Sequence, residues 1–144
     1  MANVAAPEIK EAYEQVRDNK SDVTWLLLDY ETDKSDTLNL TGKGNGGLDE
    51  LKQHLSDDRA SFGYAKITYA NDKESQREKF IFITWIGSNV KVMRKAKLSV
   101  HKADVQNVLR IFSIEVPANS LNDLDEGPIV TRLRKAGGAS YDKT

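Results

Sequence analysis

The spacing of hydrophobic residues alternates along this chain between a helical and a strand period, and each change predicts a new element. Ile9, Tyr13 and Val16 recur at helical spacing and predict a first helix from about 8 to 18. Residues 23–30 are a dense run of leucine, aromatic and β-branched side chains. Such a run predicts a strand that is buried on both faces.

Residues 37–41 alternate between polar and apolar side chains and predict a half-exposed strand. A glycine-rich turn at 42–47 and a short helix at 48–55 with one apolar face follow. The remaining pattern predicts strands at 61–69 and 79–86 around a polar turn at 71–75, a helix over 89–112, a strand at 114–116, and a helix over 125–135 that stops at Gly137-Gly138.

The predicted order is α-β-β-α-β-β-α-β-α, in which pairs of strands alternate with helices. This order predicts an α/β (α+β) fold with a mixed sheet and helices on both faces. A length of 144 residues corresponds to one domain, spanning 1–144, with a short flexible C-terminal tail from about 137 to 144.

The composition of the chain predicts the compartment in which the protein works. The chain has no cysteine, which excludes disulfides and thiolate sites and suits a reducing compartment. Its start lacks the pattern of a secretory signal, and its apolar runs are far shorter than the roughly 20 residues of a membrane span. We therefore expect a cytoplasmic protein without a transmembrane segment. The net charge of −1 gives no general attraction to nucleic acid.

Positive charge is concentrated in one segment. Between Val90 and Ile114 there are six basic residues and one acid, Asp104, which gives six minus one, or +5. A solvated helix face accounts for such a run, and so does a binding surface for an acidic partner, because one-signed charge repels itself until a partner compensates it. The charge pattern alone leaves both interpretations open.

The sequence 42–47 satisfies G-x-G-x-x-G but predicts a flexible turn more strongly than a nucleotide site, because the preceding strand is of the edge type and no acid follows about 20 residues on. His54 and His101 lie on different predicted helices, and no metal-ligand spacing is present. We therefore expect neither an enzyme nor a cofactor. Trp25 and Trp85 lie in apolar strands and are expected to pack in the core.

Three stretches identify a family resemblance: AYEQVRD at 12–18, KFIFITWIG at 79–87 and LRKAGGASYD at 133–142. The chain resembles the coactosins, which belong to the actin-depolymerising-factor homology group, from about residue 5 to 142. The resemblance implies a single homology domain with a mixed sheet of five or six strands. It also implies a monomeric protein of the actin cytoskeleton that binds the side of filaments more than actin monomers, and that opposes barbed-end capping with little severing.

The same resemblance implies the residues that contact actin. The lysine before the F-x-x-I-T-W strand corresponds to Lys79 and its basic neighbour to Arg77, although charges beside such a strand also serve as gatekeepers against aggregation. The remaining positions that the resemblance implies lie in the basic helix and before the A-G-G motif: Lys95, Lys97, Lys102 and Lys135. Arg94 is added from the charge pattern, since it lies on one side of the same helix with Lys97. The alternative is an adaptor that binds acidic phospholipids through the same +5 segment.

Overall fold

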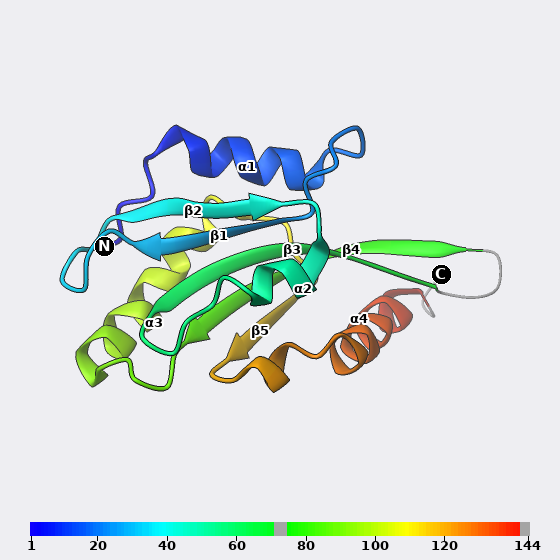
Figure 1. Ribbon diagram of the computed structural model, residues 1–144. Coiled ribbons are helices and arrows are strands. Elements are labelled where there is room, and N and C mark those ends of the chain that lie inside the picture. The colour runs from blue at the N-terminus through cyan, green and yellow to red at the C-terminus, as the bar shows by residue number, and fades with distance from the viewer. Residues whose placement is uncertain (71–74, 142–144) are drawn as a thin grey trace.

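The computed structural model describes residues 1–70 and 75–141, the last five of these as backbone only. A five-stranded sheet lies between two layers of helices (Figure 1). The elements in chain order are α1 (Pro7–Arg17), β1 (Trp25–Tyr30), β2 (Leu38–Gly44), α2 (Gly47–Lys52), β3 (Ala60–Ala70), β4 (Gln76–Ile86), α3 (Val92–Gln106), β5 (Ile114–Ala118), the 3-10 helix η1 (Leu121–Leu124) and α4 (Glu126–Tyr141).

The strand order is β2-β1-β3-β4-β5, and every neighbouring pair is antiparallel except β4 and β5. A parallel pair needs a long crossover, which α3 provides. The sheet is therefore mixed, as the sequence predicted. At one end β3 and β4 extend beyond the other strands as a long two-stranded arm (Figure 1).

The two faces of the sheet carry separate cores. One face packs under α1 and α3, with Ile9 and Leu98 fully buried against Phe62. The other packs under α2 and α4, with Leu51 and Leu133 against the opposite side of the sheet. Because consecutive strand residues point to opposite faces, even residues of β4 belong to the first core and odd residues to the second.

Several predicted boundaries were wrong. The basic helix ends at Gln106 and not near 112, and a turn follows in which the backbone N–H of Val108 donates to the Val105 carbonyl oxygen at 3.0 Å. The strand predicted at 79–86 begins at Gln76, where it pairs with Ala70 at the end of β3.

At the chain's end, α4 continues to Tyr141, past the glycine pair predicted to stop it. Residues 137–141 of the predicted tail have helical backbone, and residues 142–144 lie outside the described residues. The flexibility of the tail stays a prediction. Residues 71–74 of the predicted turn lie outside them as well.

Candidate functional site

Helix α3 has one buried stripe of side chains, and its N-terminal end carries basic residues. Leu98, His101 and Val105 face the core, and the N-cap residue Lys91 gives the helix no side-chain cap hydrogen bond. Its first turn carries no acid. The N-terminal end of a helix carries a positive partial charge, which basic residues there do not compensate. Local stability does not explain these cations, which favours a role outside the helix.

Arg94 is the exception, because its guanidinium turns toward the loop between β1 and β2. Its Nη2 donates to the carbonyl oxygens of Thr32, Asp33 and Ser35, at 3.3 Å to Thr32 and 2.9 Å to Ser35. The guanidinium also lies 3.8 Å from the centre of the Tyr30 ring, and its Nη1 is buried. These contacts give Arg94 a structural role; a contact with actin stays a prediction.

The three lysines of α3 present their charge more openly. Lys97 Nζ lies 3.3 Å from Asp36 Oδ1, and Lys102 Nζ lies 3.0 Å from Glu115 Oε1. The lysine hydrogen bonds hold the pKa of each carboxyl below its usual range. Lys95 is exposed and has no ion pair with a described residue. Exposed pairs of this kind are weak and exchange readily for a partner's carboxylates.

A titratable group lies beneath these lysines. His101 is 3% exposed, and its Nδ1 lies 2.8 Å from the Tyr30 hydroxyl. Burial lowers the pKa of His101 and raises that of Tyr30 to about 12. His101 Nε2 lies 3.8 Å from Asp36, so one carboxylate faces both the buried histidine and exposed Lys97. A change in the charge of Asp36 would therefore act on both the exposed Lys97 and the buried His101.

The sequence analysis missed an apolar stripe on the outward side of α3. Val92 and Met93 are each 77% exposed, and Val100 is 67% exposed. Ala96 and Ala103 continue the stripe at helical spacing. The signal was present in the sequence as a second set of apolar residues, but hydropathy does not tell which of two apolar faces is buried. Exposed apolar residues gathered on one face mark interaction surfaces.

Lys79 and Arg77 lie in the arm of β3 and β4, on the face of the sheet opposite to α3. They share the side of Ile81, which packs in the core under α4. Register pairs Lys79 with Ile67 and Arg77 with Tyr69 on the neighbouring strand. Lys79 is thus the fourth residue of β4 and half-buried, and does not open the strand as predicted.

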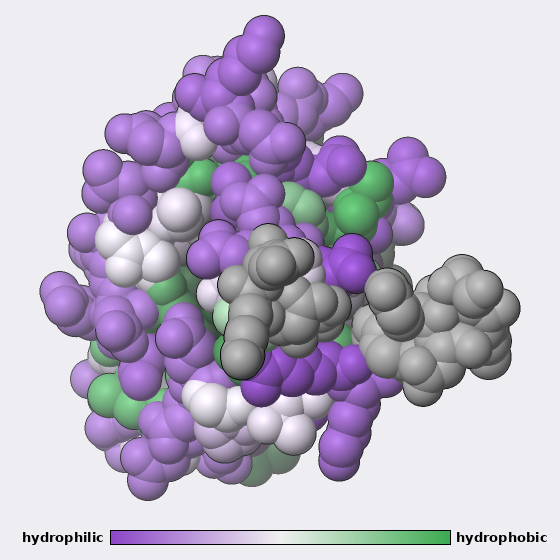
Figure 2. Space-filling view, turned by 90° about the vertical axis from the view of Figure 1, so that its right-hand side faces the viewer, coloured by the Kyte–Doolittle hydropathy of each residue, from purple (hydrophilic) through white to green (hydrophobic). Residues whose placement is uncertain are grey.

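Helix α4 brings a further cation to the same side. Arg134 donates to the carbonyl oxygen of Ala70 at 2.8 Å and lies 5.6 Å from the centre of the Tyr69 ring. These contacts fix the arm against α4, and the next residue, Lys135, is exposed. This end of the molecule is mainly hydrophilic (Figure 2).

The predicted site residues therefore form two surfaces. The helix surface comprises Lys95, Lys97 and Lys102 with the apolar stripe of α3, whereas the arm surface comprises Arg77, Lys79 and Lys135. Because α3 and α4 cover opposite faces of the sheet, the two surfaces face different directions (Figure 1).

The glycine-rich turn packs against the carboxylate of Glu50. Glu50 Oε1 accepts hydrogen bonds from the Trp25 indole at 2.7 Å and from the backbone of Gly46 at 3.1 Å. These bonds, the Trp25 bond foremost, hold the pKa of Glu50 low. Gly47 has φ of +70°, which favours glycine. A carboxylate stands where a nucleotide's phosphate would need backbone N–H groups, so the turn does not fit a nucleotide site.

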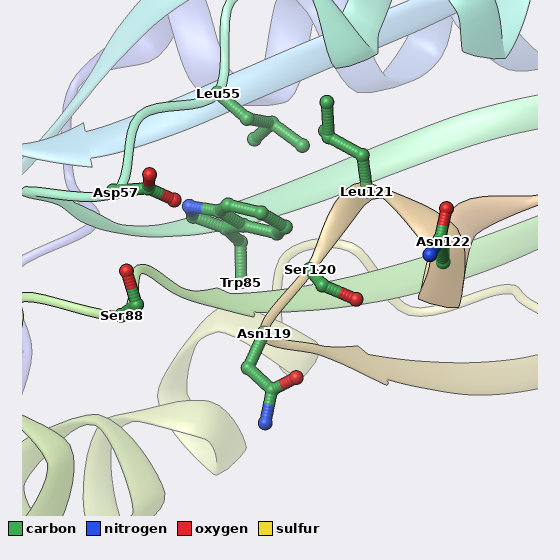
Figure 3. A pocket seen from close by; sticks show the side chains of 8 residues that line it. All are labelled: Leu55, Asp57, Trp85, Ser88, Asn119, Ser120, Leu121 and Asn122. Carbon is green, nitrogen blue, oxygen red and sulfur yellow. The ribbon is translucent and has the colours of Figure 1, made fainter.

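A shallow pocket of about 540 Å³ lies beside Trp85 (Figure 3). Trp85 donates from its indole to the Ser56 carbonyl at 2.8 Å, and the backbone of Gly87 donates to Arg59 O at 3.0 Å. A Cβ at Gly87 would lie 2.2 Å from Asp57 O, so the two segments are in close contact. The lining residues are Leu55, Asp57, Trp85, Ser88, Asn119, Ser120, Leu121 and Asn122.

One ionisable side chain, Asp57, lines this pocket, which offers no acid and base pair. Within the described residues, no cluster of three or more histidine, aspartate or glutamate side chains is placed to hold a metal. No helix in that part of the chain has a span long and apolar enough to cross a bilayer.

The mixed sheet between helices thus carries a cationic helix on one face and a basic arm on the other. The chain matches the cofilin/tropomyosin-type actin-binding proteins over residues 1–134, and it belongs to that family. It is 38% identical to coactosin of Dictyostelium discoideum over 142 residues, covering 98% of this chain and 95% of the relative.

Solved structures agree with this assignment. Human coactosin-like protein superposes with a TM-score of 0.84 at 30% identity, covering 94% of this chain and 99% of the other. Mouse coactosin, described as an actin filament binding protein, gives a TM-score of 0.76 at 32% identity, covering 99% of this chain and 96% of the other. The predicted resemblance to coactosins and the predicted fold are confirmed.

Proposed function

We propose that this actin-binding protein attaches to the side of actin filaments and regulates their dynamics. The observation that carries the proposal is the separation of the helix surface from the arm surface on opposite faces of the sheet. Two surfaces that face different directions need two partner surfaces, which adjacent subunits of a filament supply and one actin monomer does not. The similarity to mouse coactosin supports the same preference.

Further details of the proposal rest on the resemblance to coactosins. The protein opposes barbed-end capping, severs little, binds actin monomers weakly, and works in the cytoplasm as a monomer. It performs no chemistry and needs no cofactor. Membership of an actin-binding family gives no support to the acidic-phospholipid alternative.

The residues proposed to contact actin are Lys79, Arg77 and Lys135 on the arm surface and Lys95, Lys97 and Lys102 on the helix surface. Lys79 is the sharpest test among them. Its backbone is fixed by pairing with Ile67, so little entropy is lost when its charge meets a carboxylate. We expect Lys79→Ala to lose most binding in a filament co-sedimentation assay while its thermal melt stays unchanged.

The chain offers a matched control in Lys66. It is half-buried on the neighbouring strand, but it pairs with Phe80 and therefore points to the opposite face. We expect Lys66→Ala to co-sediment like the wild type. Wild-type binding by Lys79→Ala would remove this residue from the site, whereas equal loss in both variants would indicate a general effect of the arm's charge. Filament elongation with capping protein then tests the capping proposal.

A further inference from the structure

A groove lies between α1 and the segment 107–111 that follows α3, on the face of the sheet under these two helices. It has a volume of about 780 Å³ and contains none of the residues proposed to contact actin. Its lining residues are Lys10, Tyr13, Glu14, Arg17, Asn107, Val108, Arg110 and Ile111.

The walls of the groove are fixed by two tyrosines that bind one loop residue. The backbone N–H of Ile111 donates to the Tyr13 hydroxyl at 3.0 Å, and the Tyr64 hydroxyl donates to the Ile111 carbonyl. Both polar backbone groups of Ile111 are thus held by side chains that are themselves buried. The segment is therefore positioned against α1 before any partner arrives, which reduces the entropy lost on binding.

Positive charge lines both sides of the groove. Lys10 and Arg17 are seven residues apart on α1, or about two turns and ~10.5 Å, so they project to the same side of the helix. Arg110 lies across the groove, and all three are exposed. None of them makes an ion pair with a described residue. With Glu14 as the one acid in the lining, the groove carries three minus one, or +2.

The groove also offers apolar surface between these charges. Ile111 is 50% exposed, and Val108 is half-buried beside it. The exposed part of Ile111 gains contacts only if a partner covers it. Arg17 lies 5.6 Å from the centre of the Tyr13 ring, but none of the three flanking cations has an ion pair with a described residue. A partner that brings both carboxylates and an apolar side chain satisfies both requirements.

We propose that this groove docks an acidic peptide segment of a partner protein, with an apolar side chain of the segment on Ile111 and its carboxylates on Lys10, Arg17 and Arg110. A lipid surface fits less well, since a flat bilayer does not enter a hollow. A single phosphate fits less well too, because the cations stand on two sides with Glu14 among them. The proposal does not depend on how the protein binds filaments.

The experiment uses the full chain and a fluorescent peptide of about eight residues that alternates glutamate and leucine, long enough when extended to span the distance between Lys10 and Arg17. We expect saturable binding, with amide chemical-shift changes confined to α1 and 107–111. Replacing the peptide's glutamates by glutamine should weaken it. Arg110→Glu should weaken it about tenfold or more, because attraction becomes repulsion.

The matched control is Lys34→Glu, which makes the same charge change at an exposed lysine outside the groove. It should bind within about twofold of the wild type, in line with the small effect of remote exposed charges. Absence of saturable binding, equal binding of the glutamine peptide, or equal loss in both variants would overturn the proposal. So would phosphatidylserine vesicles that bind with the same dependence on Arg110. Filament co-sedimentation of Arg110→Glu should be unchanged, which separates the two proposals.

Discussion

The Arg94 guanidinium donates hydrogen bonds to carbonyl oxygens of the loop between β1 and β2 and packs on the face of the Tyr30 ring. Sequence placed it among the binding cations because it lies beside Lys95 in a one-signed run. Only the fold shows that neighbouring positions on a helix, about 100° apart, point to different surroundings.

We expect Arg94→Ala to lower the free energy of unfolding by about 1–3 kcal/mol, since it removes the charged donor to three loop carbonyl oxygens and the contact with the Tyr30 ring. Lys95→Ala should change it by less than about 0.5 kcal/mol, because Lys95 is exposed. Urea unfolding of both variants measures the difference. Equal stabilities would show that the loop does not depend on the guanidinium.

His101 should make stability depend on pH. Because burial lowers its pKa in the folded protein, the unfolded chain binds the proton more readily. The stabilisation is complete above the ordinary histidine pKa of about 6.5 and is lost as pH falls from there toward the lower folded value. The groups that face His101 are Tyr30, Asp36, Arg94, Asp104 and the N-terminus; Asp36 and Asp104 oppose the shift.

Urea unfolding midpoints should therefore fall between about pH 7.5 and 5.5, around the ordinary histidine value. His101→Gln should flatten this dependence. His54→Gln is the control, because His54 is exposed beside Trp25, and it should keep the wild-type profile. A profile unchanged by His101→Gln would assign the dependence to other groups.

At the scale of elements, α3 has two apolar faces with lysines on both flanks: Lys97 pairs with Asp36 on one side and Lys102 with Glu115 on the other. The inner face holds the helix on the sheet, whereas Met93 and Val100 on the outer face are 77% and 67% exposed. The outer face is therefore available to a partner at little cost to the fold.

We expect the double variant Met93→Glu and Val100→Glu to lose filament co-sedimentation without a change in melting temperature, because both side chains are exposed. Ile111→Glu is the comparison: it adds an acid at a similarly exposed apolar residue of the groove, and filament binding should survive. Retained binding by the double variant would limit the helix surface to its lysines.

The sequence predicted the order of all long elements, because buried strands and helices have distinct hydrophobic periods. It did not predict where β4 begins, since the residues from Gln76 to Lys79 are all polar and their strand conformation depends on pairing with β3. It did not predict the end of α3 either: Leu109 continues the helical stripe, and only tertiary packing shows that the chain has already left the helix.

At the scale of the whole molecule, a net charge of −1 conceals cationic surfaces on both faces of one sheet. The local fields, and not the total charge, govern the approach of an acidic partner such as the proposed filament. The residues proposed to contact actin were predicted from the sequence and stay a prediction, whereas their division into two surfaces depends on the sheet that separates them.

Filament binding should therefore weaken as salt rises, because the Debye length falls from about 10 Å at 0.1 M to about 3 Å at 1 M. Co-sedimentation across a salt series measures the slope. A variant with Lys95, Lys97 and Lys102 changed to alanine should show both weaker binding and a shallower slope. Wild-type binding that is constant across the series would contradict the electrostatic part of the proposed function.

The close contact at Gly87 limits how this fold can change in evolution. Any side chain begins with a Cβ, and at this position it would lie 2.2 Å from Asp57 O, where ordinary contacts are 3.4–4 Å. To admit one, the backbone of 56–59 would have to withdraw from the end of β4, and Trp85 would lose the Ser56 carbonyl that its indole binds. Descendants of this sequence can therefore exchange Gly87 only together with the segment that covers it.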